Sequence, residues 1–217
     1  MDDLPLFPIA IVLLPQEDIP LHIFEPRYRR MLADCLAGDR RFGLIYKPDG
    51  AGERELPAGH VGCVAVVEEH EPLPDGRSNI LVRGEEPVVI EQVHDDRSYA
   101  TATASPLADS VERASEDAEA DALSAFADLQ KAIGDDTPAP DAGQGLSYAL
   151  AGRVDWPAAT KQALLEERDE AARLRRVTLL LRAAVRGLKL ADAAQERARK
   201  NGRVRTADEL AAELGLE

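Results

Sequence analysis

The residues of this chain most suited to bind a metal are four histidines and two cysteines. His60 and Cys63 have an H-x-x-C spacing that two ligands of one metal could use. In an extended chain, however, side chains three residues apart point to opposite faces and cannot share one ion. A tetrahedral zinc site needs four ligands. The other candidates are dispersed along the chain, at His22, Cys35, His70 and His94. We therefore predict no metal site.

Two short patterns begin like nucleotide-binding or catalytic motifs without completing them. Gly143 and Gly145 open a G-x-G-x-x-G pattern, but Tyr148 takes the place of the third glycine and no strand precedes it. The run from Gly145 to Ala149 fails the last position of the G-x-S-x-G elbow of hydrolases. The sequence also lacks the G-x-x-x-x-G-K-[ST] loop that cradles phosphates. These patterns predict a non-enzymatic protein without a cofactor.

The remaining charged clusters fit solvated surfaces. Glu68, Glu69 and Glu71 stand beside a Pro-Asp-Gly turn and are expected to lie in water rather than to act as an acid–base pair. Asp169 and Arg173 are four residues apart, which predicts a surface ion pair on a helix worth roughly a few tenths of a kcal/mol. No catalytic constellation emerges from these groups.

Composition narrows the class of protein and its partners. The chain has 217 residues, 45% of them hydrophobic, and a net charge of −14. An acidic chain is a poor match for nucleic acid, because such binding depends on Lys and Arg neutralising phosphates. The N-terminus is not a basic signal segment, and the apolar run Ile9–Leu14 is too short to span a membrane. Cys35 and Cys63 fit small core residues in a reducing cytosol. We expect a cytoplasmic protein without a membrane partner.

The chain is organised around the stretch from Ile19 to Leu36. Its first part alternates apolar residues with a period of two, which predicts a strand. Pro26 then begins a helix, because proline at the first position loses only a hydrogen bond that had no partner. The apolar residues recur with helical spacing, at Tyr28, Met31, Leu32, Cys35 and Leu36. A short amphipathic helix must therefore fold back onto a sheet.

The first half of the chain, 1–107, predicts a β domain. Short strands are expected at 4–7, 19–23, 42–46, 61–69, 78–83, 88–93 and 99–107. Gly84 separates two of them, at a bulge or a tight bend. About six short strands at close spacing, with one inserted helix, indicate a small closed or nearly closed barrel.

From Ala108 onward the apolar period becomes helical. An acidic face over 109–122 and a stripe ending near Gly134 predict one helix, and Asp155 is expected to cap a later one. The longest stripe runs from Leu174 to Leu188. We therefore expect an α-helical subdomain over 108–187. A polar extension over 188–217 follows, in which Thr206–Glu209 forms a capping box before a last short helix. The fold class is α+β.

LPLFPIAIVLLPQEDIPLHIFEPRYRRMLADCL resembles the opening of the Lon N-terminal (substrate-binding) domain family, in its stand-alone bacterial form. The likeness extends from Leu4 to about Arg186. It includes GHVGCVA around Cys63 and LPDGRSNILVRGEEPVVI around Gly84. It implies a PUA-like β pseudobarrel followed by a helical bundle, without the ATPase and protease domains of Lon. The family often has a glycine where this chain has Gln16, so the shape of that loop is not carried over.

The resemblance implies a module that binds unfolded or degron-bearing polypeptides, either in the cleft between barrel and helices or on an apolar surface patch. A protease or chaperone is a further candidate partner. The candidate polypeptide-binding residues are Leu13, Leu14, Phe24 and Tyr28. Leu13 and Leu14 stand out because adjacent apolar residues entering a turn do not easily both point inward. Tyr28 shares the buried stripe of its helix, so a core role is the simpler interpretation for it.

Two alternatives from other classes stay open. One is RNA binding through the barrel, which would need a basic face. Its residues would be Arg27, Arg29, Arg30, Arg40 and Arg41. The other is an adaptor that docks onto a protease or another partner through the segment Thr206–Glu217. The residues leave the oligomeric state open.

Overall fold

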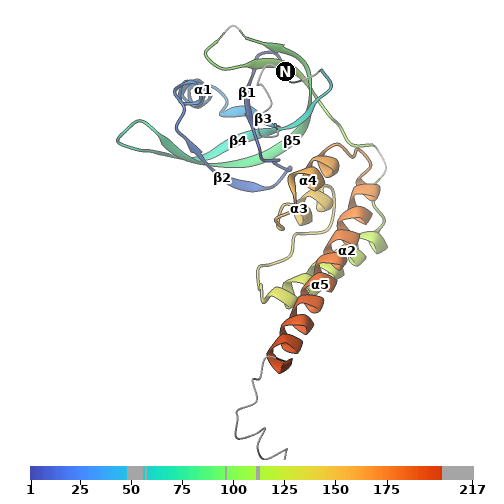
Figure 1. Ribbon diagram of the computed structural model, residues 1–217. Helices are drawn as coiled ribbons and strands as arrows, with labels where there is room; N and C mark the ends of the chain where they lie inside the picture. Colours follow the sequence, from blue (N-terminus) through green and yellow to red (C-terminus); the bar gives the residue numbers. More distant parts are fainter. Residues whose placement is uncertain (48–55, 57, 96, 111–112, 202–217) are drawn as a thin grey trace, which may run out of the picture.

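A computed structural model describes residues 1–47, 56, 58–95, 97–110 and 113–201. The strands are β1 (Leu4–Ile9), β2 (Asp18–Ile23), β3 (Arg41–Tyr46), β4 (Val61–Pro72), β5 (Ser78–His94) and β6 (Thr101–Pro106). The helices are α1 (Pro26–Ala37), α2 (Glu116–Ile133), α3 (Leu146–Ala151), α4 (Ala158–Leu165) and α5 (Glu170–Asn201). A β domain carrying α1 is followed by a helical part, as Figure 1 shows. The α+β prediction is confirmed.

Five of the strands form a closed ring. The sheet order is β2-β5-β4-β3-β1-β6, and β6 also pairs with β5, which returns the ladder to its start. β1 pairs in parallel with β3, whereas the other pairings in the ring are antiparallel. β2 lies outside the ring and pairs with the first half of β5.

A compact apolar cluster fills the ring. Every strand of the ring contributes to it, and its members are Leu4, Leu6, Ile45, Val64, Val88, Ile90, Ala102 and Ala104. In a barrel, alternate residues of each strand point inward, so residues that all five strands supply to one cluster occupy the interior. The small alanines of β6 suit the limited space inside so few strands.

β5 is one strand where the sequence predicts two. It runs for 17 residues and pairs with β2, β4 and β6. Its ladder with β4 changes register between the pairs Cys63–Pro87 and Ala65–Gly84. The predicted interruption at Gly84 is therefore a bulge that bends a continuous strand, because one extra residue bends a strand without ending it.

The helix α1 covers the outside of the barrel. It begins at Pro26 and buries Tyr28, Met31, Leu32 and Cys35, as its spacing predicts. Phe7 and Phe42 contribute rings to the same core and lie 5.9 Å apart in an edge-to-face arrangement. Aromatic pairs of this geometry add about 0.5–1.5 kcal/mol beyond their buried area.

In the helical part, α2 packs along α5, and α3 and α4 lie next to the barrel (Figure 1). Ser115 caps α2, so the helix begins at Glu116 rather than near Asp109 as the sequence predicts. It ends at Gly134, as predicted, and that residue has a left-handed conformation. The residue before α4 is Pro157 and no side chain caps that helix, so the predicted cap at Asp155 is wrong. Among the described residues, no helix combines the length and apolarity needed to cross a bilayer.

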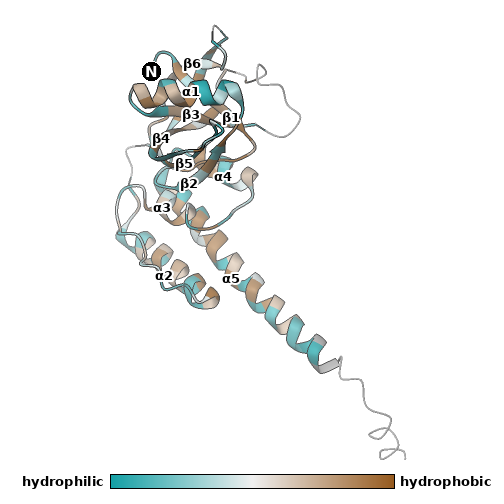
Figure 2. Cartoon of the chain, turned by 90° about the vertical axis from the view of Figure 1, so that its left-hand side faces the viewer, coloured by the Kyte–Doolittle hydropathy of each residue, from teal (hydrophilic) through white to brown (hydrophobic). Residues whose placement is uncertain are grey.

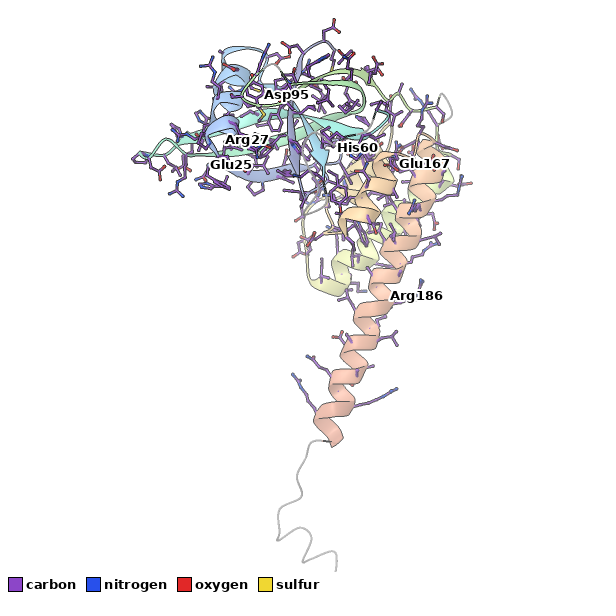
Figure 3. The ribbon with its side chains drawn as sticks, turned by 45° about the horizontal axis from the view of Figure 1, so that its top comes forward. Glu25, Arg27, His60, Asp95, Glu167 and Arg186 are labelled. Carbon is purple, nitrogen blue, oxygen red and sulfur yellow. The ribbon has the colours of Figure 1, made fainter. Side chains whose placement is uncertain are left out.

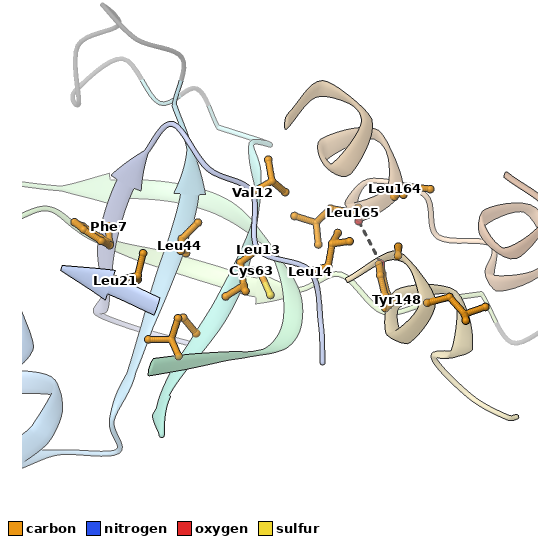
Figure 4. Packing of buried hydrophobic residues seen from close by; sticks show 14 of the residues in the cluster. Phe7, Val12, Leu13, Leu14, Leu21, Leu44, Cys63, Tyr148, Leu164 and Leu165 are labelled. Atoms are coloured by element: carbon orange, nitrogen blue, oxygen red, sulfur yellow. Dashed lines mark hydrogen bonds between the residues drawn. The ribbon is translucent and has the colours of Figure 1, made fainter. Parts of the chain in front are cut away.

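The barrel and the helices share one large hydrophobic core. It extends from Phe7 in β1 to Val185 in α5 without interruption. Figure 4 shows part of this packing, with residues of the barrel on one side and of α3 and α4 on the other. α5 continues beyond this core, and Figure 2 shows hydrophilic and hydrophobic residues mixed along its outer turns. The predicted helix after Thr206 lies outside the described residues.

Candidate functional site

The outer edge of β2 carries backbone groups that no strand of the described chain pairs with. β2 stands at one end of the strand order. The N–H of Gly84 donates to the carbonyl of Glu17 at 2.9 Å, so the backbone of Glu17 faces β5. Because alternate residues of a strand direct their backbone groups to opposite sides, Asp18, Pro20 and His22 face outward. This edge therefore offers the N–H groups of Asp18 and His22 and the carbonyls of all three.

Pro20 is the sequence signal for this edge. It lies in the middle of β2, and proline within a sheet is confined to positions whose N–H would not enter the ladder. Its place facing outward satisfies that requirement. The alternating pattern of this segment predicts a strand but not an edge, which only the position of the proline indicates.

Phe24 adjoins this edge and is the most accessible of the four predicted site residues. Its side chain is 58% exposed, and its ring stacks on that of His22 with centroids 6.1 Å apart. His22 is itself held, because its Nδ1 lies 2.8 Å from Oδ1 of Asn79, whose amide donates to Glu71. Phe24 thus presents a large apolar surface next to unpaired backbone groups.

Leu13 and Leu14 are fully buried, so the expectation that they cannot both point inward is wrong. Their loop runs between the barrel and α4, which gives both side chains an apolar environment on opposite sides. In Figure 4, Leu13 lies toward Cys63 of β4 and Leu14 toward Leu165 of α4. In this conformation neither side chain is available to a bound polypeptide.

Tyr28 is also buried, with 4% of its surface exposed. Its ring meets Phe7 edge to face at 4.5 Å, beneath the guanidinium of Arg27. The simpler interpretation of Tyr28 as a core residue therefore describes its position. Of the four predicted residues, Phe24 alone lies on the surface.

The loop before β2 keeps a shape that normally requires glycine. Gln16 has φ = 66°, in the left-handed region. Its side-chain amide donates to the carbonyl of Gly145 at 3.4 Å. The carboxylate of Glu17 accepts from the N–H of Leu14 at 2.9 Å and from Lys161 of α4 at 2.6 Å. These bonds fix the entry of the chain into β2 against the helical part.

A cleft of about 650 Å³ lies between parts of the barrel and of the helical part. Its walls combine the loop at Gln16, residues 85–87 of β5 and the segments around Asp109 and Gly145. Among the described residues of the lining, the carboxylates are Glu85, Glu86, Asp109, Glu119 and Glu170, and Arg113 is the one basic residue. This acidic lining suits a polar or basic segment better than the apolar segment expected there.

Arg173 lies behind the helical wall of this cleft and donates hydrogen bonds to two of its lining residues. It is fully buried, so the predicted surface pair with Asp169 is wrong. Its guanidinium donates to both oxygens of Asp109, at 2.9 and 2.5 Å, and to Glu170. It also lies 3.7 Å from the centre of the Tyr148 ring. Asp169 instead accepts from two N–H groups in the first turn of α5.

The histidine and the cysteines considered as metal ligands in the sequence lie in structural positions. Nε2 of His60 lies 3.0 Å from the carbonyl oxygen of Tyr46. Burial raises the pKa of the Cys63 thiol and that of Cys35, the latter to about 12. A thiol with so high a pKa stays protonated and is a poor nucleophile and metal ligand. Within the described residues, no three His, Cys, Asp or Glu side chains come together as a metal site.

The arginines of the RNA alternative do not form a free basic face. Arg27 pairs with Glu25, Arg30 with Asp34 and Arg41 with Glu85. Arg40 donates to backbone carbonyls of β4. Arg29 lies against the turn at Gly76, where an added Cβ would stand 2.1 Å from its guanidinium. Neighbouring carboxylates therefore offset much of the positive charge available to phosphates.

Curated proteins resemble part of this chain. A 36% identical segment of 94 residues occurs in "LON peptidase N-terminal domain and RING finger protein C14F5.10c" of Schizosaccharomyces pombe, covering 37% of this chain and 19% of that protein. A Lon protease of Trichlorobacter lovleyi is 38% identical over 84 residues, 37% of this chain and 10% of its own length. The chain thus spans a fifth or less of these curated relatives.

Solved structures extend the likeness to the helices. The crystal structure of a Lon N-terminal domain protein from Xanthomonas campestris has a TM-score of 0.62 and 25% identity, covering 82% of this chain and 97% of that one. The N-terminal domain of the Mycobacterium avium complex Lon protease shares the fold, with a TM-score of 0.60, 16% identity, and coverage of 83% and 98%. A family model described as the ATP-dependent protease La (LON) substrate-binding domain matches residues 3–183. Because this match covers most of the barrel and the helices, the chain belongs to the Lon substrate-binding domain family.

Proposed function

We propose that this chain is a non-enzymatic polypeptide-binding module. It captures extended segments of unfolded or degron-bearing polypeptides as an added strand along β2, with Phe24 as the apolar anchor. The observation that carries this proposal is the open edge of β2, where the backbone groups of Asp18, Pro20 and His22 face outward. Delivery of the captured segment to a separate protease or chaperone would follow binding.

Strand addition accounts for a preference for unfolded chains. The backbone groups of a folded protein are already paired, whereas an unfolded segment still has free N–H and carbonyl groups to offer. In this binding mode main-chain hydrogen bonds supply affinity, and neighbouring side chains supply specificity. Phe24, which is exposed beside the edge, would select an apolar residue in the bound segment. The membership of the chain in a substrate-binding family supports this activity.

The test is fluorescence anisotropy with a labelled, permanently unfolded polypeptide. We expect saturable binding that survives moderate salt, and binding about tenfold weaker for Phe24→Ala, equivalent to about 1.4 kcal/mol. Ile133→Ala is the matched control, since Ile133 is 56% exposed on α2, far from β2 in the chain. A short binding peptide that is N-methylated on alternate residues should lose affinity in one register only, because only alternate N–H groups meet β2.

Three results would contradict the proposal. Equal affinity for wild type and Phe24→Ala would remove the β2 edge as the site. Insensitivity to N-methylation in both registers would exclude strand addition. If the polypeptide does not bind and a structured RNA, measured in parallel, binds in a salt-sensitive way, the RNA alternative would be favoured.

A further inference from the structure

One face of α5 is exposed along nearly the whole helix. With 3.6 residues per turn, ten residues between positions 175 and 197 fall within about 60° of one line along the helix. All of them are exposed. They are Arg175, Arg176, Leu179, Arg182, Ala183, Arg186, Leu190, Ala193, Ala194 and Arg197. We call this set the outer α5 face. At 1.5 Å per residue it is about 33 Å long.

The outer α5 face is basic on an acidic protein. Half of its residues are arginines and none is acidic, although the whole chain has a net charge of −14. Arg182 pairs with Asp121 of α2. For Arg175, Arg176, Arg186 and Arg197, the described part of the chain supplies no ion pair. Figure 3 shows the side chain of Arg186 pointing away from the helix.

The same face carries apolar residues between its arginines. Leu179 is 64% exposed and Leu190 is 72% exposed, so both leave most of their apolar area in water. They lie three helical turns apart, about 16 Å, on nearly the same line. Ala183, Ala193 and Ala194 are small enough to let another backbone approach between them. Leucines set among alanines on one helix face form a seam for a second helix.

The turns of α5 beyond Val185 add an independent reason to expect a partner. Every residue from Arg186 to Arg197 is exposed, whereas the preceding turns pack on α2 and α3. Helices shorter than about 12–15 residues are marginal alone in water, because most helical stability in proteins comes from packing. A helix that projects this far from its core gains stability when another element covers it.

We propose that the outer α5 face docks an acidic amphipathic helix of a partner protein. Carboxylates along such a helix would meet Arg186 and Arg197, and its apolar residues would cover Leu179 and Leu190. Complementary charge favours this occupant over a second copy of α5, whose equivalent face would present five arginines to five arginines. The leucines and alanines favour it over nucleic acid, since they offer phosphates no contact.

Two peptides of identical length test the proposal with the full chain. One is a labelled 21-residue amphipathic helix with leucines on one face and glutamates beside them, and the other replaces each glutamate by lysine. We expect the acidic peptide to bind and the basic peptide not to bind. Arg186→Glu combined with Arg197→Glu should weaken the acidic peptide at least tenfold and restore binding of the basic one.

Lys189→Glu combined with Arg199→Glu is the matched control. It changes the net charge equally on exposed residues that lie off the outer α5 face, and should alter affinity less than twofold. Leu190→Ser should weaken binding without changing charge. Circular dichroism confirms that each variant folds. Phe24→Ala should leave this binding unchanged, which separates it from strand addition at β2.

Four outcomes would overturn the proposal. They are equal losses in both charge-reversed variants, no binding of the acidic peptide at 100 µM, preference for poly-uridine over the peptide, and self-association that Leu190→Ser abolishes. A chain ending at Asn201 provides one further arm. If it binds the peptide and the full chain does not, the occupant is the chain's own acidic segment 206–217 rather than a partner.

Discussion

The junction between barrel and helices and the outer edge of β2 use polar groups in opposite ways. At the junction, Glu17 and Lys161 pair at 2.6 Å with only 9% of each side chain exposed. Arg173 is fully buried and finds Asp109, Glu170 and Ser147 as partners. At the edge of β2, backbone donors and acceptors face outward, and no strand of the described residues pairs with them. The polar groups at the junction thus have partners within the chain, whereas the backbone groups at the edge of β2 can accept a partner from outside.

The two regions therefore differ in role. The junction positions the loop before β2, and the edge of β2 is the proposed surface for polypeptide recognition. Buried ion pairs add little net stability, but each depends on both partners because a lone buried charge is costly. The junction therefore sets how the loop before β2 leaves the core and where its edge lies. The outer edge of β2 can stay unpaired because the rest of the chain holds this strand in place. Perturbations of the two regions should accordingly affect different measurements, stability at the junction and binding at the edge.

The largest effect should come from Arg173→Ala. It leaves the carboxylates of Asp109 and Glu170 without their buried partner, and we expect a loss of about 3–5 kcal/mol in the free energy of unfolding. Urea denaturation measures it. Arg175→Ala, two residues away on the exposed face, should change stability by less than about 0.5 kcal/mol. Equal effects of the two substitutions would show that the buried network does not support the junction.

Leu14→Ala should come next, with a loss of about 2–5 kcal/mol, because it removes a fully buried side chain between barrel and α4. Phe24→Ala removes a larger side chain but one that is mostly exposed, so its unfolding free energy should change by less than about 0.5 kcal/mol. At temperatures where both variants are folded, Phe24→Ala should weaken polypeptide binding more than Leu14→Ala does. A folded Leu14→Ala protein that loses binding as Phe24→Ala does would contradict the buried role of the loop.

Gly84→Ala probes the contact between the loop and β5. An added Cβ would lie 2.1 Å from the carbonyl oxygen of Leu14, so either the loop or the bulge must move. We expect a loss of about 1–3 kcal/mol, as for other overpacked sites. Gly187→Ala is the control, since a Cβ there meets nothing within 4 Å. It should stabilise α5 by about 0.5–1 kcal/mol, because alanine is the better helix former.

The smallest effect should be the dependence of the Asp18–Arg83 pair on pH. The hydrogen bond from Arg83 lowers the pKa of Asp18, although both side chains are largely exposed. A lowered pKa stabilises the folded state above the ordinary pKa of aspartate, about 3.9, and this stabilisation disappears as pH falls through the folded value. Asp18→Asn should therefore cost about 0.5 kcal/mol at pH 7 and nothing near pH 2.

Urea midpoints between pH 2 and pH 7 test this dependence. Wild type and variant should have parallel curves above about pH 5 and converge at acid pH. A constant difference over the whole range would mean that the charge of Asp18 is not responsible.

Local patterns in the sequence account for much of the fold. The alternation before Glu25 and the helical spacing after Pro26 predict β2 and α1 at nearly their observed positions. Gly134 ends α2 as expected, because a left-handed residue suits glycine. These features depend on neighbours in the chain, which the sequence displays directly.

The candidate site was harder to predict because it depends on distant parts of the chain. In the sequence, Arg173 is spaced to pair with Asp169 on the surface of a helix. Its observed partner Asp109 lies more than sixty residues away. The sequence suggests that Leu13 and Leu14 cannot both be buried at their turn. In the fold, residues of α4 pack against them. The sequence offers Phe24 as a candidate, but the edge beside it follows from the place of β2 in the sheet order. Gln16 shows the converse, since it keeps a glycine-like conformation without being glycine.

The closure of the ring has a consequence for how the chain folds. The pairing of Leu4 with Ala102 joins strands that are about a hundred residues apart in the sequence. Contacts between distant residues slow folding, because the entropy of closing the loop is lost before the contact is made. During synthesis, β1 can pair with β3 early, but its other side must wait until β6 has left the ribosome. The seam between β1 and β6 should therefore form after the ladder between β1 and β3, and a nascent chain would carry an open strand until then.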